Sequence, residues 1–537
     1  MIAEVIPYRK TIRGKDYFDY AIPEDCTVTE GSLVLIPFRS STLLGIVRKI
    51  KATSNAQRLK SISTVVPDTS WKTAERMALL EWFAAYYCVS LPHSFKLFQE
   101  EYLQRPRTIP LNIQLSQGTV ESKPIHIKKG HVHVIHYSHM DDRGPLYSSI
   151  ASETSNHVLI IIPEHSEASR LISALSISRY LLIESNPAPS TIASIKKTLT
   201  EETDQIVVVA TRKTALLILH LCPTIILDQE ESKSHKQYDL NPRYHTRSVL
   251  LQARALAPKT TQSTIILASH APTAYTYQHA QDDGYEWLDK QRPWNRDNST
   301  LIDMETEKLG NNYSWFSSEL LKRTANAKKT LLLFNRTGEF GTSLCTDCAT
   351  LLASGATSCS SCKGSNIRRT RKGTKALEEE LHTAFQHKKI LRVDREQDLD
   401  NIEQRIADAD IIVATEKIFR LTPMSLFDLI GIVSIDHQLT YPHFRAHERT
   451  FQFLFKVLGS GITNIVQTHA PHHPVIRAAV EGNYNAFITD ELTIRMMMGL
   501  PPFKDRYTLI DTNSKKVEIV ESIPTTLPSS IVVDREE

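Results

Sequence analysis

Glycine is scarce in this chain, which has 18 glycines among 537 residues. That is about 3%, against a usual share of about 7%. Phosphate-binding loops use glycine because their backbone must wrap closely around the anion. The shortage counts against an intact phosphate loop, and no G-x-x-x-x-G-K-[ST] string occurs anywhere in the sequence.

Long apolar runs are missing as well, since no stretch approaches the ~18 residues that span a bilayer. The first twenty residues carry charges where a signal peptide needs apolar side chains. Neither sign of charge dominates, because 63 Lys and Arg face 60 Asp and Glu. We expect a cytoplasmic, monomeric protein without membrane contact, in which nucleic-acid binding depends on local patches.

Cysteines number seven, and four of them form two C-x2-C pairs separated by ten residues. Two such pairs can surround one tetrahedral Zn²⁺ and leave no coordination position open for water. The spacing predicts one structural zinc per chain, and the alternative is four unmetallated thiols. The predicted ligands are Cys345, Cys348, Cys359 and Cys362.

Short apolar runs alternate with helical stretches from about residue 131 onward. Such runs are typical of parallel sheets that are covered on both faces by helices. They occur at 157–163, 179–185, 205–210, 224–228 and 263–268, and again at 330–334, 388–394, 410–415, 430–436 and 464–468. The pattern predicts an α/β fold with two tandem parallel-sheet domains, at 131–300 and 325–480, and a zinc ribbon at 340–366 inserted in the second.

The remaining segments are smaller. Residues 1–105 predict a β-rich domain with an amphipathic helix at 71–87, and 106–130 predict a linker or a remnant domain. Residues 485–537 predict a short C-terminal domain. Four histidines are expected on a partly exposed strand rather than at a metal; they are His131, His133, His136 and His139.

Several segments, in their order along the chain, carry a family resemblance. They include YFDY (17–20), GSLVLIPF (31–38), SHKQYDLNPRYHTRS (234–248), FRAHERTFQFL (444–454) and ELTIRMMMGLPPF (491–503). With them the sequence resembles the PriA family of replication-restart helicases. The resemblance implies a 3′-DNA-end-binding domain, two RecA-like domains, and as partners forked or single-stranded DNA with 3′ ends and other primosome or replication proteins.

The resemblance also nominates DNA-binding residues. Phe18, Asp19 and Tyr20 stand where the family binds a 3′ end, and Lys60 stands where it neutralises a phosphate. The alternative is an ordinary strand with core aromatics and a surface acid. In the loop that contacts single-stranded DNA, the candidates are Lys236, Arg243, Tyr244 and Arg247. The alternative is that this loop is kept only for folding.

Three departures concern the ATP site of the resembled family. HYSHMDDRGPLYSS (136–149) stands in place of its phosphate loop, and its D-E-E-H motif reads Asp228-Gln229-Glu230-Glu231. KVLGSGITN (456–464) replaces its arginine-bearing segment. The site is therefore interpreted as degenerate, with no catalytic residue and with neither ATP nor Mg²⁺ expected as a working cofactor.

A further departure concerns zinc, because the family carries eight cysteines and only the outer four are present here. The leading interpretation is a structure-specific DNA-binding protein of replication restart that recognises forks and 3′ ends. Two alternatives stay open: an active ATP-dependent 3′-5′ DNA helicase, and a zinc-ribbon interaction module.

Overall fold

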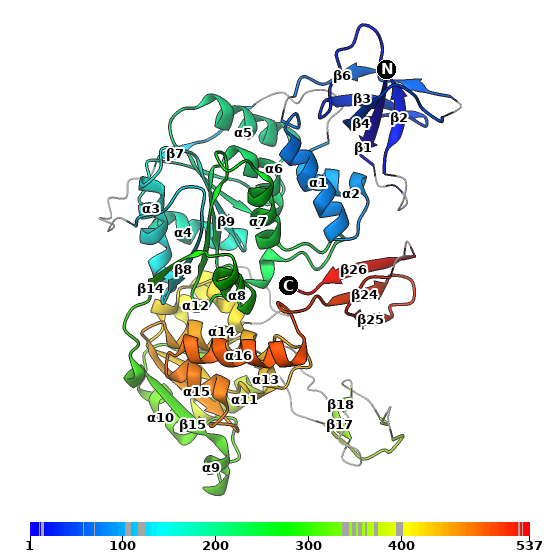
Figure 1. The fold of residues 1–537 in the computed structure, drawn as a ribbon. Coiled ribbons are helices and arrows are strands. Elements are labelled where there is room, and N and C mark those ends of the chain that lie inside the picture. The colour runs from blue at the N-terminus through cyan, green and yellow to red at the C-terminus, as the bar shows by residue number, and fades with distance from the viewer. Residues whose placement is uncertain are drawn as a thin grey trace. The chain divides into compact units, whose positions relative to one another are not determined.

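The computed structural model (Figure 1) describes residues 1–9, 11, 16–56, 58–68, 70–101, 109–115, 125–335, 343–345, 351–352, 357–359, 362–369, 374–393, 401–524, 527–528 and 530–537. The chain forms two compact units. The first unit comprises Met1–Tyr137, Asp141–Lys290 and Leu492–Glu537. The second comprises Ser138–Met140 and Gln291–Glu491.

The N-terminal sheet has six strands in the order β5-β2-β1-β4-β3-β6. Its pairs are antiparallel except for β2 and β5, which run parallel. β3 and β4 form a hairpin across a short polar turn, and the sheet confirms the predicted β-rich domain. The strands are β1 (Ile2–Pro7), β2 (Phe18–Ala21), β3 (Leu33–Phe38), β4 (Ser41–Lys51), β5 (Lys60–Ser61) and β6 (Thr64–Val65).

Two helices follow this sheet, α1 (Ala74–Tyr86) and α2 (Leu91–Phe98). The apolar repeat of α1 buries Leu80 and Phe83 on one face. These side chains belong to the same hydrophobic cluster as Val208 and Val249 of the next domain. The predicted helix at 71–87 is therefore confirmed, and it joins the N-terminal domain to the first α/β domain through one shared core.

The first α/β domain is built on an eight-stranded sheet in the order β14-β8-β13-β12-β9-β11-β10-β7. All its neighbouring strands are parallel except β7, which pairs antiparallel with β10. The strands are β7 (Gln114–Leu115), β8 (Val132–Tyr137), β9 (Val158–Ile162), β10 (Arg179–Leu182), β11 (Val207–Thr211), β12 (Thr224–Asp228), β13 (Thr264–Ser269) and β14 (Glu286–Lys290). The helices between them are α3 (Arg143–Ser152), α4 (Ala168–Ala174), α5 (Pro189–Glu201), α6 (Arg212–Ile218), α7 (Thr246–Leu256) and α8 (Ala274–Asp282).

The second α/β domain has a six-stranded, fully parallel sheet in the order β15-β23-β22-β16-β21-β20. Its strands are β15 (Ser299–Asp303), β16 (Thr330–Leu333), β20 (Ile390–Val393), β21 (Ile411–Ala414), β22 (Leu429–Ile432) and β23 (Thr463–Thr468). Helices α10 (Ser318–Asn326) and α11 (Thr374–Ala384) cover one face and share a core with it. The helices from here on are α9 (Met304–Leu309), α10 (Ser318–Asn326), α11 (Thr374–Ala384), α12 (Ile402–Asp408), α13 (Asp436–Leu439), α14 (Ala446–Leu458), α15 (Pro474–Val480) and α16 (Tyr484–Met498).

Two small antiparallel sheets complete the chain. One has the order β18-β17-β19, with β17 (Ser343–Cys345), β18 (Leu351–Leu352) and β19 (Ile367–Arg369). The other, called the C-terminal sheet below, has the order β25-β24-β26, with β24 (Tyr507–Asp511), β25 (Val517–Val520) and β26 (Ile531–Arg535). Among the described residues, none of the helices has the length and apolar character to cross a membrane.

The ten strands predicted from apolar runs are all confirmed. One prediction about β8 is wrong, because every residue of this strand is buried rather than partly exposed. β13 and β14 flank β8 on both sides, and the flanking strands hide His133 and His136 from solvent. Within the described residues, no group of His, Cys, Asp and Glu is arranged as a metal site.

Candidate nucleotide site and nucleic-acid interface

The residues interpreted above as a degenerate nucleotide site lie at the carboxyl edge of the first α/β sheet. Asp228 ends β12 and pairs with Ala268 of β13, which pairs in turn with Ile135 of β8. Because these strands are parallel, their carboxyl ends meet at one edge, where α/β folds bind ligands. After β8 and a short turn at Met140–Asp142, α3 begins at this edge with Arg143.

Arg143 and Tyr147 of α3 occupy both carboxylate oxygens of Asp228. Arg143 Nη1 donates to Oδ2 at 2.7 Å, and the Tyr147 hydroxyl donates to Oδ1 at 2.6 Å. Asp228 is 0% exposed and Arg143 is 3% exposed. Burial raises the pKa of Asp228, and the contacts with Arg143 and Tyr147 only partly offset this rise. A Mg²⁺ ion at this carboxylate would have to displace a buried arginine that already neutralises it.

Gln229 joins Glu167 to the hydrogen-bond network of Asp228 and Arg143. Its Nε2 donates to Glu167 Oε2 at 2.7 Å, and Arg143 Nη1 lies 3.6 Å from the same oxygen. The only glycine of segment 136–149, Gly144, serves close packing, since a Cβ there would lie 2.3 Å from the backbone oxygen of Ala174. This glycine therefore allows α3 to pack closely and is not part of a glycine-rich loop of the kind that wraps a phosphate.

Glu230 and Glu231 also point into the protein. Glu230 accepts a hydrogen bond from Arg247 Nη1 at 3.0 Å and one from the backbone N–H of Thr273 at 2.7 Å. Glu231 Oε1 lies 2.9 Å from Nδ1 of His270. Burial alone would raise the pKa of Glu231. His270 and neighbouring hydrogen-bond donors lower it by more than burial raises it, so this pKa lies below its usual value. These acids hold α7 and the end of β13 in place.

The loop at 234–248 is attached directly to this site. His235 Nε2 donates to the backbone oxygen of Asp228 at 2.7 Å. Burial lowers the pKa of His235 to about 4, so the imidazole is neutral at pH 7. The loop cannot move away from β12 without breaking this buried hydrogen bond.

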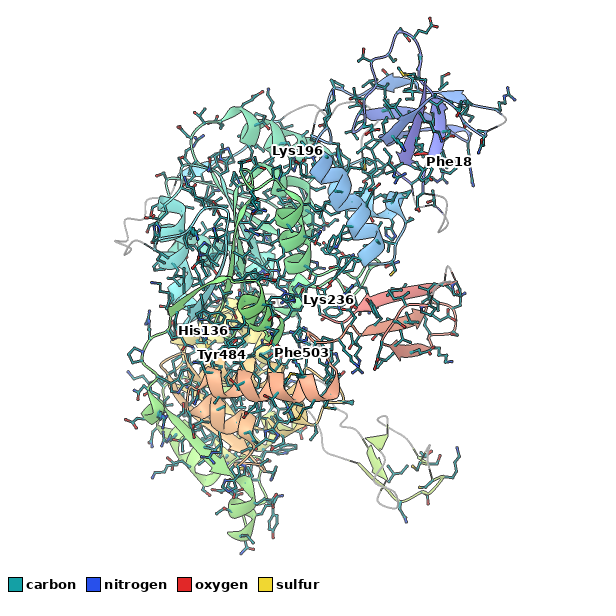
Figure 2. All side chains as sticks on the ribbon, in the orientation of Figure 1. Phe18, His136, Lys196, Lys236, Tyr484 and Phe503 are labelled. Atoms are coloured by element: carbon teal, nitrogen blue, oxygen red, sulfur yellow. The ribbon has the colours of Figure 1, made fainter. Side chains whose placement is uncertain are left out.

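Two of the predicted DNA-binding cations in this loop face the C-terminal sheet, as Figure 2 shows for Lys236. Lys236 Nζ lies 2.6 Å from Asp534 Oδ1, and Arg243 Nη1 lies 3.0 Å from Asp534 Oδ2. The side chain of Lys236 is 6% exposed and that of Arg243 is 24% exposed. One carboxylate of β26 therefore bridges both cations.

The other two candidates in the loop are buried. Tyr244 packs 5.7 Å, centroid to centroid, from Phe83 of α1. Arg247 binds Glu230, and its guanidinium carbon lies 4.1 Å from the ring centroid of Tyr275. Neither side chain reaches a DNA strand unless the loop rearranges, so the structure gives both a clear role in folding.

The N-terminal candidates divide between the two faces of β2. Asp19 accepts hydrogen bonds from Ser54 and makes an ion pair with Lys51 Nζ at 2.8 Å. Burial raises the pKa of Asp19, but the hydrogen bonds from Lys51 and Ser54 outweigh it, so the pKa lies below its usual range. This carboxylate stays charged and partly open to solvent.

Phe18 and Tyr20 lie on the other face of β2. Phe18, labelled in Figure 2, packs edge to face against Phe38 at 5.3 Å and remains partly exposed. Tyr20 is 4% exposed, donates to the backbone oxygen of Pro37, and belongs to the domain core. Lys60 is exposed on β5, and its Nζ donates to the backbone oxygen of Arg39 at 3.2 Å. Phe18, Asp19 and Lys60 are accessible to a ligand, whereas Tyr20 is a core residue.

The cysteines are only partly within the described residues, and Cys348 lies outside them. Cys359 is buried, its N–H donates to Gly364 O at 2.8 Å, and its carbonyl accepts from Lys363 at 3.0 Å. Lys363 has φ +62°, which closes the chain into a tight turn. β19 follows this turn and pairs Ile367 with Cys345 of β17. The backbone thus places Cys345 in the same small sheet as the strand that follows Cys359 and Cys362.

An aromatic pocket escaped the sequence analysis. It has a volume of about 430 Å³ and lies between α1, α7 and α8. Its lining includes Trp82, Tyr86, Tyr275, His279 and Tyr285. The signal was present in EWFAAYY (81–87), but a helical pattern shows which residues are apolar and not which of them remain outside the core.

Comparison with known proteins agrees with this arrangement. Residues 7–98 match the family model of the PriA 3′ DNA-binding domain (3′BD), a range that includes Asp19 and Lys60. The chain is 25% identical to the replication restart protein PriA of Rickettsia typhi over 96% of its length, and covers 88% of that relative. It is 27% identical to those of Haemophilus influenzae and Bacillus subtilis, over 59% and 52% of this chain and 48% and 40% of theirs.

Two solved structures align more loosely. A DEAD box protein from Methanococcus jannaschii gives a TM-score of 0.31 at 11% identity, covering 69% of this chain and 87% of that chain. Dbp5 of S. cerevisiae gives 0.38 at 10% identity, covering 69% and 88%. The sheets of the two α/β domains, parallel apart from β7, confirm the predicted α/β fold class.

Proposed function

We propose that the chain is a member of the PriA family of replication restart proteins and that it binds forked DNA with 3′ ends without hydrolysing ATP. Its DNA-binding role in replication restart follows from the family and from the 3′ DNA-binding domain. Fork preference, the lost ATPase and partnership with other primosome proteins are the parts that need testing.

One contact carries the proposal that ATP hydrolysis is lost: Arg143 bound to Asp228 at 2.7 Å. Phosphoryl transfer needs a phosphate cradle, a Mg²⁺ ligand with a group that orients water, and a cation for the transition state. Here both oxygens of Asp228 are occupied by α3, and Gln229 donates to Glu167. The RecA-like domain then acts as a scaffold that positions DNA-binding surfaces.

The proposed 3′-end site consists of accessible side chains on both faces of the sheet at β2 and β5: Asp19 on one face, and Phe18 and Lys60 on the other. A partly exposed Phe18 ring can stack on a terminal base. The charged Asp19 carboxylate can accept a hydrogen bond from a 3′-hydroxyl, and Lys60 can neutralise a nearby phosphate. Because Asp19 is negative, a terminal 3′-phosphate would meet repulsion where a hydroxyl would donate a hydrogen bond.

The experiment that tests this function compares two forks that differ only at the 3′ end of the nascent strand. We expect a fork with a 3′-hydroxyl to bind about tenfold more tightly than one with a 3′-phosphate, as one hydrogen bond to a charged group would give. Equal affinity for both forks would contradict the 3′-end proposal. A fork affinity no higher than that for blunt duplex would instead favour the zinc-ribbon interaction module.

We further propose that one structural Zn²⁺ is held by Cys345, Cys348, Cys359 and Cys362. Structural zinc contributes its binding free energy to folding, so it would fix the ribbon and the basic segment after it. Elemental analysis of protein purified under reducing conditions should give one zinc per chain, and Cys348→Ser should lower this to near zero. Two metals per chain, or none, would contradict this assignment.

A further inference from the structure

The loop at 234–248 contacts the C-terminal sheet, which lies about three hundred residues further along the chain. Asp534 of β26 places one carboxylate oxygen 2.6 Å from Lys236 Nζ and the other 3.0 Å from Arg243 Nη1. Asp534 is 7% exposed, and Lys236 is 6% exposed. The two cations are therefore spaced to bind the two oxygens of a single anion.

A backbone phosphate of nucleic acid also presents two charged oxygens to cations at these distances. We propose that Lys236 and Arg243 form a binding site for one phosphate of single-stranded DNA, and that Asp534 occupies this site, so that β26 and DNA compete for it. This inference rests on the proposed function, because it takes the loop to bind DNA.

Residues in β26 and directly after it hold the carboxylate in position. The guanidinium carbon of Arg535 lies 3.8 Å from the ring centroid of Tyr86, and the Tyr87 hydroxyl donates to Glu537 Oε1 at 3.1 Å. Lys236 Nζ also donates to the backbone oxygen of Arg535 at 2.5 Å. DNA must break these contacts before it reaches the two cations. The apparent affinity for DNA is therefore the intrinsic affinity multiplied by the small fraction of molecules in which β26 is released.

The test compares Asp534→Asn with Glu536→Gln, two neighbouring variants with the same change in charge. Glu536 binds Thr508 and Arg506 inside the C-terminal sheet. We expect Asp534→Asn to bind a circular single strand about tenfold more tightly than the unaltered protein, and Glu536→Gln to bind it within about twofold. A circular strand has no 3′ end, so it reports on the loop alone.

A double-mutant cycle sharpens this test. Lys236→Gln should change the binding of the unaltered protein little, because its charge is already neutralised, and should remove most of the gain in the Asp534→Asn background. Equal gains from Asp534→Asn and Glu536→Gln would mean a general charge effect and would overturn the proposal. No gain from Asp534→Asn would overturn it as well.

Hydrogen exchange on the unaltered protein gives a measurement that needs no variant. Saturating circular single strand should increase amide exchange in Ile531–Arg535 and leave β1 unchanged. Unchanged exchange in β26 at saturation would overturn the competition. Binding of 3′-hydroxyl forks with no effect of Asp534→Asn would remove only this inference, whereas failure to bind either DNA would remove the proposed function as well.

Discussion

Two aspartates in two regions of the first unit show how differently the same side chain can be placed. Asp19 lies on the N-terminal sheet beside Lys51 and Ser54, and its pKa lies below the usual range although burial alone would raise it. Asp228 lies at the edge of the first α/β sheet under Arg143 and Tyr147, and burial raises its pKa. The Asp19 carboxylate is charged and accessible, whereas the Asp228 carboxylate is buried with both oxygens bound by its own chain.

The difference shows that a match to a motif does not by itself tell whether the polar atoms of a residue are open to a ligand. Asp228 matches the first acid of the family motif, yet both of its oxygens bind its own chain. A buried acid of this kind needs its partner for stability, because a lone charge in the interior is costly. In this structure the Asp228 carboxylate belongs to an internal ion pair with Arg143.

The largest effect should come from breaking that ion pair. Arg143→Ala leaves Asp228 buried without its cation, and we expect it to lower the free energy of unfolding by about 3–5 kcal/mol. The matched control is Arg179→Ala, whose partners Glu202 and Asp204 are at the surface, with an expected loss of at most about 1 kcal/mol. Urea unfolding measures both variants. Equal losses would mean that the site is not sealed by Arg143.

Lowering the pH should reduce the free energy of unfolding, because protonation of the buried His235 is unfavourable in the folded protein. Its pKa is about 4 in the folded protein because of burial, against ~6.5 in the unfolded chain. Between these values the unfolded state binds the proton and the folded state does not, so stability is complete above pH ~6.5 and falls as the pH drops toward 4. At pH 5 this one group should cost about 2 kcal/mol.

Urea midpoints at pH 7 and pH 5 check this prediction. His235→Gln should reduce the pH dependence by that amount, whereas His126→Gln, at an exposed position, should leave it unchanged. An unchanged slope in His235→Gln would show that the imidazole takes up its proton without opening the loop.

The smallest effect concerns the open carboxylate. Asp19→Ala should remove the roughly tenfold preference for a 3′-hydroxyl fork, about 1.4 kcal/mol, and leave salt-sensitive background binding. Asp25→Ala makes the same change of charge at an exposed position of the same domain and should keep the preference. Fluorescence anisotropy with the two forks measures it. A preference that survives Asp19→Ala would place the end-binding site elsewhere.

Much of the fold could be predicted, because fully buried parallel strands are continuous apolar runs. β14 and β15 were missed, since EWLDK and STLID mix polar and apolar residues at sheet edges. The full burial of β8 was also missed, because histidines suggested solvent where two neighbouring strands exclude it.

For the candidate nucleotide site, the sequence shows only which motif residues of the resembled family are missing. An absent G-K-[ST] string and Gln229 in place of an acid are visible in the sequence. The contact of Arg143 with Asp228 and that of Asp534 with Lys236 are not, because they join residues 85 and about 300 positions apart. Tyr20 and Tyr244 matched DNA-binding motifs and prove to be buried, since aromatic residues serve cores as readily as bases.

The most direct measurement is ATP hydrolysis by a preparation that has been shown to bind forked DNA. We expect saturable fork binding and no turnover above a nuclease-free blank, with or without the fork, and no rescue in Gln229→Glu, because Arg143 would still occupy Asp228. Fork-stimulated hydrolysis that disappears in Asp228→Ala would contradict a sealed nucleotide site and would establish an active helicase instead.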